Sequence, residues 1–485
     1  MLLALCPFRL QAAACALTPD VGLNLGPTDY TQRLRPRGEL KAVMLFVDFP
    51  DAAASETPEQ LYNLLVPYAA EWIAEVSNGV ASLKVTPVKQ WYRMPKPSTE
   101  YQWRNLTTPN HNAYVWDAVA ASAGAHVAFT RYDLVYILAA RGGAIFNSPT
   151  LEVAPGNGIP VEGGEIRQVV TLGNDTRGPR AHYGSHVMLH EMGHLFGLPD
   201  LYEYGERDFL RSVGGWDTMS WVATGAHFTA WQKAKLGWIE PDQIQCVPNG
   251  AVTATLTPVE TARGLKALAV PVSPSRAYVV EAREPIKADA GLCDQGLLVY
   301  TVDTTIGSGR GAMKVIGGTR GAHDEGTRKC GPAYDATFSL KAGKPSLFED
   351  PGAGVSIELL DASPGAYRVR VTRSAPAPGP ALLISRSSVA WTWRAGEPAP
   401  AAHSVSVTST SAALPPALSV ATSRSPWLSV AVDSPTAPAK LTIAANPAGL
   451  KPGHYTGTVT VTSPGAGFSP RTVAATLTIL PAGAK

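Results

Sequence analysis

The chain of 485 residues has few charged side chains. Asp, Glu, Lys and Arg make up 16% of it, below the quarter that is usual in soluble proteins, and the formal net charge is only +2. Such a chain offers no electrostatic case for binding nucleic acid or an anionic surface. A glycine-rich phosphate loop and a dinucleotide fingerprint are missing as well. We therefore expect neither nucleic-acid nor nucleotide partners.

Long apolar runs are also missing. No run of 18 or more apolar residues follows the N-terminus, so we expect no membrane-spanning helix. Residues 1–16 are mostly apolar, with one arginine at position 9, and they end in Ala-Cys-Ala, a pattern typical of signal-peptide cleavage. We expect this segment to be a leader and the protein to be secreted. A cell-surface lipoprotein attached near residues 12–15 is the less favoured alternative.

Cysteine is scarce, with five residues in the chain. Cys6 and Cys15 fall in the expected leader, which leaves Cys246, Cys293 and Cys330. An exported chain can pair two of these and leave one free, and we favour Cys293 with Cys330. Three buried thiols are the alternative.

Histidine is sparse too, yet residues 190–194 read His-Glu-Met-Gly-His. Helix positions four apart lie one turn apart on the same face, so His190 and His194 can bind one metal ion. Glu191 lies beside the first ligand, where a carboxylate can reach the attacking water. This is the H-E-x-x-H pattern of zinc hydrolases.

Catalytic zinc takes three protein ligands and keeps one position open. Gly197 and Pro199 should end the helix and turn the chain. Asp200 follows His194 by six residues, the spacing of the third ligand in metzincins. We predict Asp200 as the third ligand and rank Glu203 second. The simpler alternative is a helix with two surface histidines.

Residues 214–220 (GGWDTMS) support the zinc interpretation. A tight turn that carries a methionine beneath the metal is the Met-turn of metzincins, and Met219 would be that residue. The alternative is an ordinary core methionine. We expect His186 to be a helix-face residue without chemistry, or else a second-layer partner of the site. His227 either polarises the scissile carbonyl or is structural, with equal weight.

These segments resemble the immune inhibitor A family of secreted bacterial metallopeptidases. The matching stretches are Leu40–Asp51, Trp72–Gly79, His190–Tyr202, Gly214–Ser220, Ala230–Trp238 and Tyr278–Asp303. The resemblance spans roughly residues 36–373. It implies a metzincin-like peptidase that binds Zn²⁺ and cleaves protein or peptide substrates. Members of this family carry a longer N-terminal pro-segment than the two dozen residues found here.

We predict a multidomain fold class: an α/β zincin-type (metzincin-like) peptidase domain followed by two β-sandwich domains. The expected parts are a leader (1–16), a lead-in (17–38), the peptidase domain (39–246), a β-sandwich (247–373), a Pro-rich linker (374–380) and an immunoglobulin-like module (381–485). In the peptidase domain we expect strands at 40–49, 80–88, 132–139 and 168–172 and helices at 58–77, 111–123 and 185–196, with 168–172 as the edge strand beside the site.

The last module resembles the BACON-type immunoglobulin-like modules of secreted proteins. It is nearly uncharged and contains Trp391, Trp393 and Trp427. We favour a spacer with these rings in its core. Contact with a glycan, a protein or a cell surface is the alternative.

Asp48 and Asp51 follow the first expected strand. They could join a Ca²⁺ site in an exported enzyme, but no clear calcium motif supports this. We favour a role in capping the turn.

The sequence thus predicts a secreted, monomeric zinc endopeptidase. Glu191 would take a proton from the attacking water and pass it to the leaving amine. The alternatives are an idle peptidase scaffold that binds surfaces or glycans, and a zinc hydrolase of a non-peptide amide.

Overall fold

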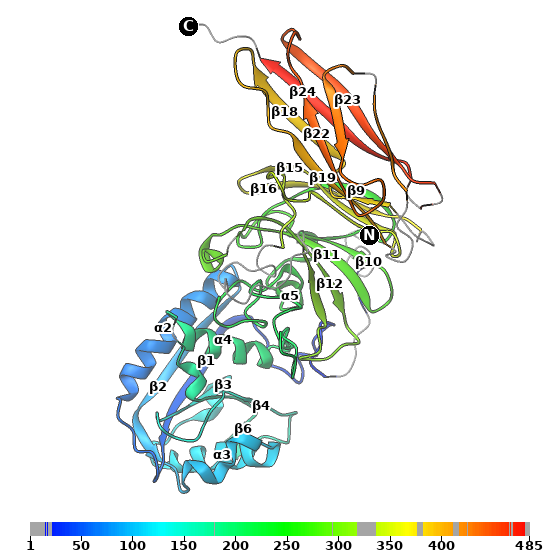
Figure 1. The fold of residues 1–485 in the computed structure, drawn as a ribbon. Helices are drawn as coiled ribbons and strands as arrows, with labels where there is room; N and C mark the ends of the chain where they lie inside the picture. Colours follow the sequence, from blue (N-terminus) through cyan, green and yellow to red (C-terminus); the bar gives the residue numbers. More distant parts are fainter. Residues whose placement is uncertain are drawn as a thin grey trace, which may run out of the picture.

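The computed structural model describes residues 15, 17, 22–178, 180–292, 294–317, 336–375, 382–410, 417–423, 425–464, 466 and 469–480. This part of the chain is mostly β and contains several sheets, of which two pairs form sandwiches. An α/β region, a middle sandwich and a C-terminal sandwich follow one another along the chain (Figure 1). Among the described helices, none combines the length and the apolar character needed to cross a membrane.

The N-terminal region is built on a mixed five-stranded sheet. Across the sheet the strands are β2 (Ala81–Arg93), β1 (Gly38–Asp48), β3 (Leu134–Ala139), β7 (Gln168–Leu172) and β4 (Thr150–Glu152). The first four strands are parallel, and β4 pairs antiparallel with β7. We expected residues 168–172 to form the edge strand, and this is wrong. β4 takes that place, and its three residues are too few to show a periodic pattern.

Helices cover both faces of this sheet. They are α2 (Pro58–Val76), α3 (Thr108–Ala121) and α4 (Tyr183–Leu195), and a short α5 (Ala230–Lys235) follows. α2 and α4 pack with one face of the sheet and α3 with the other. Thr57 and Gln60 form a capping box at the start of α2, and Asn78 and Gly79 at its end have positive φ angles. The helix expected at 58–77 is therefore confirmed.

Short elements complete the N-terminal region. They are the hairpin β5 (Ile159–Val161) and β6 (Gly164–Ile166) and the 3₁₀ turns at Ser98–Tyr101, Trp103–Asn105, Ala123–Ala125, Phe129–Arg131 and Asn174–Thr176.

The middle region is a β-sandwich. One sheet contains β13 (Met313–Ile316), β12 (Gly296–Asp303), β11 (Arg276–Arg283), β10 (Ala267–Pro271) and β8 (Ile244–Cys246). The other contains β14 (Leu347–Asp350), β15 (Val355–Ser363), β16 (Ala366–Arg373) and β9 (Gly250–Leu256). Alternate residues of both sheets meet in one core, for example Val280 with Ile357 and Val369. The strands expected from residue 252 onward are confirmed, whereas β13 and β14 were missed inside a glycine-rich connection.

The middle sandwich and the α/β region share a core. The outward face of β10–β12 contributes Ala269, Val279 and Tyr300 to the same apolar cluster as Trp216 and Met219. The expected boundary at residue 246 therefore does not coincide with a gap in the hydrophobic packing.

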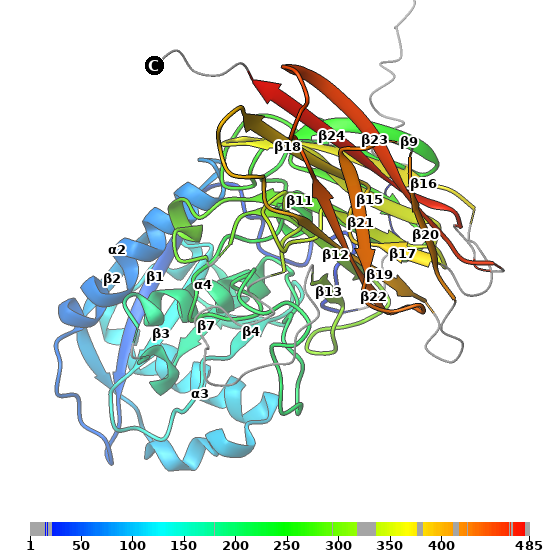
Figure 2. The same cartoon turned by 45° about the horizontal axis from the view of Figure 1, so that its top comes forward.

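The C-terminal region is a second sandwich (Figure 2). Its sheets are β17 (Leu382–Ile384), β19 (His403–Ser409), β22 (Ala439–Ala445) and β21 (Leu428–Val432), and β18 (Ser388–Arg394), β24 (Arg471–Leu480), β23 (Gly453–Thr462) and β20 (Ser419–Thr422). Trp391 and Trp427 are buried between the sheets with ring centroids 6.2 Å apart. Trp393 is half-buried. The favoured expectation of rings in the core is therefore confirmed for Trp391 and Trp427.

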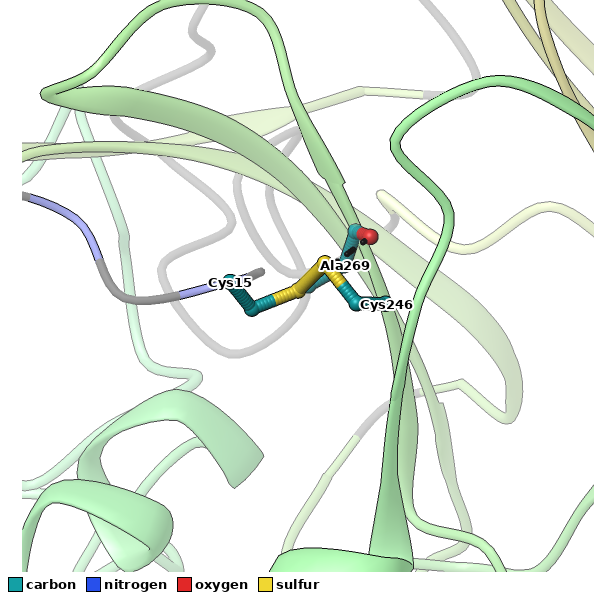
Figure 3. The surroundings of a disulfide bond; sticks show 3 residues. All are labelled: Cys15, Cys246 and Ala269. Carbon is teal, nitrogen blue, oxygen red and sulfur yellow. Dashed lines mark hydrogen bonds between the residues drawn. A yellow bond between two sulfur atoms is a disulfide. The ribbon is translucent and has the colours of Figure 1, made fainter. Parts of the chain in front are cut away.

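A disulfide joins Cys15 to Cys246, with 5.6 Å between their Cα atoms (Figure 3). The bond contradicts the placement of Cys15 in a leader that ends at residue 16, and it contradicts the favoured expectation that Cys246 stays unpaired. The two residues are 231 positions apart, so no local pattern indicates that they meet. The favoured pairing of Cys293 with Cys330 lies outside the described residues.

Candidate metal site

The end of α4 fixes the direction in which the chain leaves the helix. Gly197 has a φ of +89°, a conformation that glycine adopts without strain. Its N–H donates to His194 O (2.9 Å), and the N–H of Leu198 donates to Gly193 O (3.0 Å). This pair of bonds is a Schellman motif. The helix stop expected at Gly197 is confirmed, and it turns Asp200 back toward the helix.

The two α4 histidines are held by backbone carbonyls. Nδ1 of His190 lies 3.0 Å from Thr218 O, and Nδ1 of His194 lies 2.8 Å from Leu198 O. Because a carbonyl oxygen can only accept, each Nδ1 must carry the hydrogen. Each neutral ring therefore presents the lone pair of Nε2 on its other side. Metal-binding histidines are oriented by this kind of second contact.

Asp200 faces both lone pairs. Its Oδ1 lies 2.9 Å from Nε2 of His190 and 3.4 Å from Nε2 of His194. Burial lowers the pKa of each histidine, but the contact with Asp200 outweighs it and raises both values. Burial would raise the pKa of Asp200, yet the two imidazoles bring it far below its ordinary value.

This donor set fits a metal ion. Two imidazole lone pairs and a carboxylate oxygen repel one another unless a cation, either a proton or a metal ion, lies between them. Two nitrogens and one oxygen are a known three-ligand set for catalytic zinc. His190, His194 and Asp200 are thus brought together in the arrangement that the sequence predicts, and they could hold zinc.

Glu191 lies next to this group. One of its carboxylate oxygens, one ring nitrogen of His190 and one of His194 all lie within 4.8 Å of one another. One water molecule can bridge such a distance. Burial raises the pKa of Glu191 to about 8, and the charge of a bound cation would act in the opposite direction. Glu191 and His194 are only partly buried, so the group reaches the surface.

Met219 packs directly beneath α4. It is fully buried, and a Cβ at Gly193 would lie 2.6 Å from its sulfur. Asp217 holds the turn by accepting from the N–H groups of Met219 (2.8 Å) and Thr229 (2.7 Å). The methionine therefore contacts the helix between the two histidines, where a Met-turn residue is expected.

Glu203, the second candidate for the third ligand, is engaged elsewhere. It pairs with Arg211 and accepts a hydrogen bond from Ser212. Its side chain is thus directed to partners other than the histidines.

The two further histidines lie apart from this group. His186 contacts the hydroxyl of Tyr68 at 3.2 Å. His227 is fully buried beside Asp289 and lies 3.9 Å from a Glu75 oxygen. This burial agrees with the structural alternative for His227.

Asp48 and Asp51 do not form an open carboxylate cluster. Asp48 pairs with Arg93 at 2.6 Å, and Asp51 accepts from the N–H (2.7 Å) and hydroxyl (2.8 Å) of Ser98. Asp48 also accepts from the N–H of Ala54 (3.2 Å) and so caps the turn as we favoured. Asp51 instead ties this turn to Ser98, 47 positions away.

Sequence reasoning missed the residues that surround the donor set. Tyr204 and Ser308 donate to Asp200. Arg33 donates to His194 O (3.2 Å) and pairs with Glu152 on β4, whose pKa burial raises to about 7. Ser308 is 108 residues from Asp200, so only the folded chain reveals the contact.

No family model and no curated protein matches the chain. A solved structure of a protein of unknown function from Porphyromonas gingivalis W83 is 11% identical; the match covers 47% of this chain and 100% of that chain, with a TM-score of 0.18. An endo-fucoidan hydrolase from glycoside hydrolase family 107 is 10% identical; the match covers 53% of this chain and 48% of that chain, with a TM-score of 0.15. Scores this low carry no argument about fold or function.

Proposed function

We propose that the protein is a secreted zinc endopeptidase of the metzincin-like kind, similar to the immune inhibitor A peptidases. One observation carries this proposal. Nε2 of His190, Nε2 of His194 and Oδ1 of Asp200 converge, while backbone carbonyls fix the tautomer of each ring. Two imidazole nitrogens and one carboxylate oxygen, with each ring held by a second contact, are the kind of set that binds catalytic zinc.

The roles of the residues follow from their positions. Zinc, when bound, acidifies a water molecule and polarises a carbonyl oxygen. The carboxylate of Glu191 accepts a proton from the water as the water oxygen attacks the peptide carbon. Glu191 then gives this proton to the amide nitrogen as the C–N bond breaks, which releases an amine and a carboxylic acid. His190, His194 and Asp200 hold the metal throughout.

Secretion is part of the proposal. Structural disulfides are typical of oxidising compartments outside the cytosol, and the Cys15–Cys246 bond agrees with export. We propose protein or peptide substrates. We also propose that the C-terminal module is a spacer, because its tryptophans pack in or against its core.

The deciding experiment compares the purified chain with Glu191→Gln. We expect both to contain one zinc ion, and only the parent to cleave casein, with at least a hundredfold loss in the variant because the proton carrier is removed. Glu162→Gln, at an exposed position, is the matched control and should cleave like the parent. Metal content is measured by elemental analysis and cleavage by peptide release.

Two other results would contradict the proposed peptidase activity. Zinc in both proteins with cleavage by neither would favour a surface-binding role or a non-peptide amide as substrate. A metal-free parent that cannot be loaded with zinc would overturn the proposal.

A further inference from the structure

The two carboxylate oxygens of Asp200 have separate tasks. Oδ1 faces the Nε2 atoms of His190 and His194. Oδ2 accepts hydrogen bonds from the hydroxyl of Tyr204 and from the hydroxyl of Ser308 at 3.0 Å. Because two donors engage Oδ2, the carboxylate is oriented with Oδ1 alone toward the histidines.

The backbone around Asp200 is held by the same segment. The N–H of Asp200 donates to Ser308 Oγ (2.8 Å), and the N–H of Gly309 donates to Asp200 O (3.1 Å). The N–H of Tyr204 in turn donates to Gly309 O (2.9 Å). A Cβ at Gly309 would lie 2.3 Å from the Tyr204 ring, so only glycine allows this close approach. Residues 308 and 309 thus bridge both ends of the 200–204 segment.

Residues 308 and 309 lie outside the predicted peptidase domain (39–246). Ser308 lies in the loop between β12 and β13 of the middle sandwich. Its N–H donates to Leu23 O at 3.0 Å, so the N-terminal lead-in contacts this loop. Three segments that are distant in sequence therefore meet at Ser308.

We propose that Ser308 and Tyr204 are positioning residues of the metal centre. Their hydroxyls restrict Asp200 to binding through one oxygen, and the middle sandwich is thereby part of the centre. This inference rests on the proposed zinc site. Its physical basis is that groups which orient a ligand add to metal affinity, and their loss typically weakens binding 10- to 100-fold. A carboxylate that uses a single oxygen also leaves a coordination position for water.

The test measures zinc affinity, with no reliance on activity. The full-length chain is stripped of metal, and its zinc dissociation constant is determined by competition with a chromogenic chelator. Ser308→Ala and Tyr204→Phe each remove one hydroxyl from Oδ2, and the double variant removes both. We expect about 10- to 100-fold weaker binding in the double variant and intermediate values in the single ones. The single variants keep the test valid if the double variant does not fold.

A control variant separates this effect from general loosening of the loop. Thr305→Val lies in the same loop and removes a hydroxyl that donates to Asp303 at 2.6 Å and not to Asp200. We expect it to bind zinc like the parent. Unchanged zinc affinity in folded Ser308→Ala and Tyr204→Phe would overturn the positioning role of these two hydroxyls. It would not contradict the proposed zinc site itself. A parent that binds no zinc would overturn both.

Discussion

Residues of one type have different environments on α4. His190 and His186 are one turn apart, and both are buried. The carboxylate of Asp200 raises the pKa of His190. His186 faces the Tyr68 hydroxyl, and burial lowers its pKa to about 4. The difference between the two imidazoles is therefore set by the partner that each one meets.

The low pKa of His186 makes stability depend on pH. Between pH 6.5 and 4 the unfolded chain binds a proton that folded His186 does not, so the free energy of unfolding falls as the pH falls. We expect this residue to account for about 3 kcal/mol of loss between pH 7 and pH 4. Glutamine does not titrate, so the free energy of unfolding of His186→Gln should fall by about 3 kcal/mol less than that of the parent over this pH range. Urea unfolding of both metal-free proteins across this range measures it. Parallel pH profiles would contradict the prediction.

At the scale of elements, the candidate metal site depends on close packing of α4 against the turn that carries Met219. Gly193 lies between the two histidines along the helix, and Met219 occupies the space that a side chain there would fill. Asp217 accepts bonds from two backbone N–H groups and from Gln232 (2.8 Å), which fixes the turn. The distance between helix and turn thus sets where Thr218 O meets His190.

Gly193→Ala tests this packing. The added methyl group must displace Met219, and we expect a loss of about 1–3 kcal/mol in the free energy of unfolding. Because His190 and Thr218 move apart, zinc binding should weaken as well. Gly124→Ala, where a Cβ meets nothing within 4 Å, is the control. If Gly193→Ala has the same free energy of unfolding as the parent, Met219 can move away from the new methyl group without loss of stability, and the prediction is wrong.

At the scale of the whole molecule, the α/β region and the middle sandwich are joined by a buried ionic cluster. Arg283 is fully buried and contacts Glu260 (3.1 Å), Glu281 (3.1 Å) and Asp289. It also donates to Trp216 O (3.0 Å), three residues before Met219. Charges buried this deeply tolerate the loss of a partner poorly. The interface is therefore continuous with the core around the candidate metal site.

Truncation should reveal this dependence. A chain that ends at residue 246 exposes the apolar surface around Trp216 and loses Arg283 and Ser308, so we expect it neither to unfold cooperatively nor to bind zinc. A chain that ends at residue 375 keeps both residues, and we expect it to unfold cooperatively and to bind zinc. Among the described residues, the core of the C-terminal module takes only Leu347 from the middle sandwich, so its removal disturbs the rest little. Circular dichroism, urea unfolding and zinc titration of the two chains decide the matter. Cooperative unfolding of the shorter chain would contradict a shared core.

The sequence by itself determined the features that depend on local contacts. The four-residue spacing of His190 and His194 places them on one helix face, and Gly197 ends that helix in the expected conformation. α2 likewise follows from its capping box and apolar spacing. Each of these is decided by residues within a few positions of one another, so the pattern is visible in the chain.

Only the tertiary structure decided which distant residues meet. Ser308 binds Asp200 across 108 positions, and Cys15 pairs with Cys246 across 231. Glu152 lies on an edge strand of only three residues, which is too short to show a period. Such contacts depend on how sheets and loops pack. The residues next to a hydroxyl or thiol in the sequence do not indicate which distant group it will contact, because that contact forms only when the chain folds.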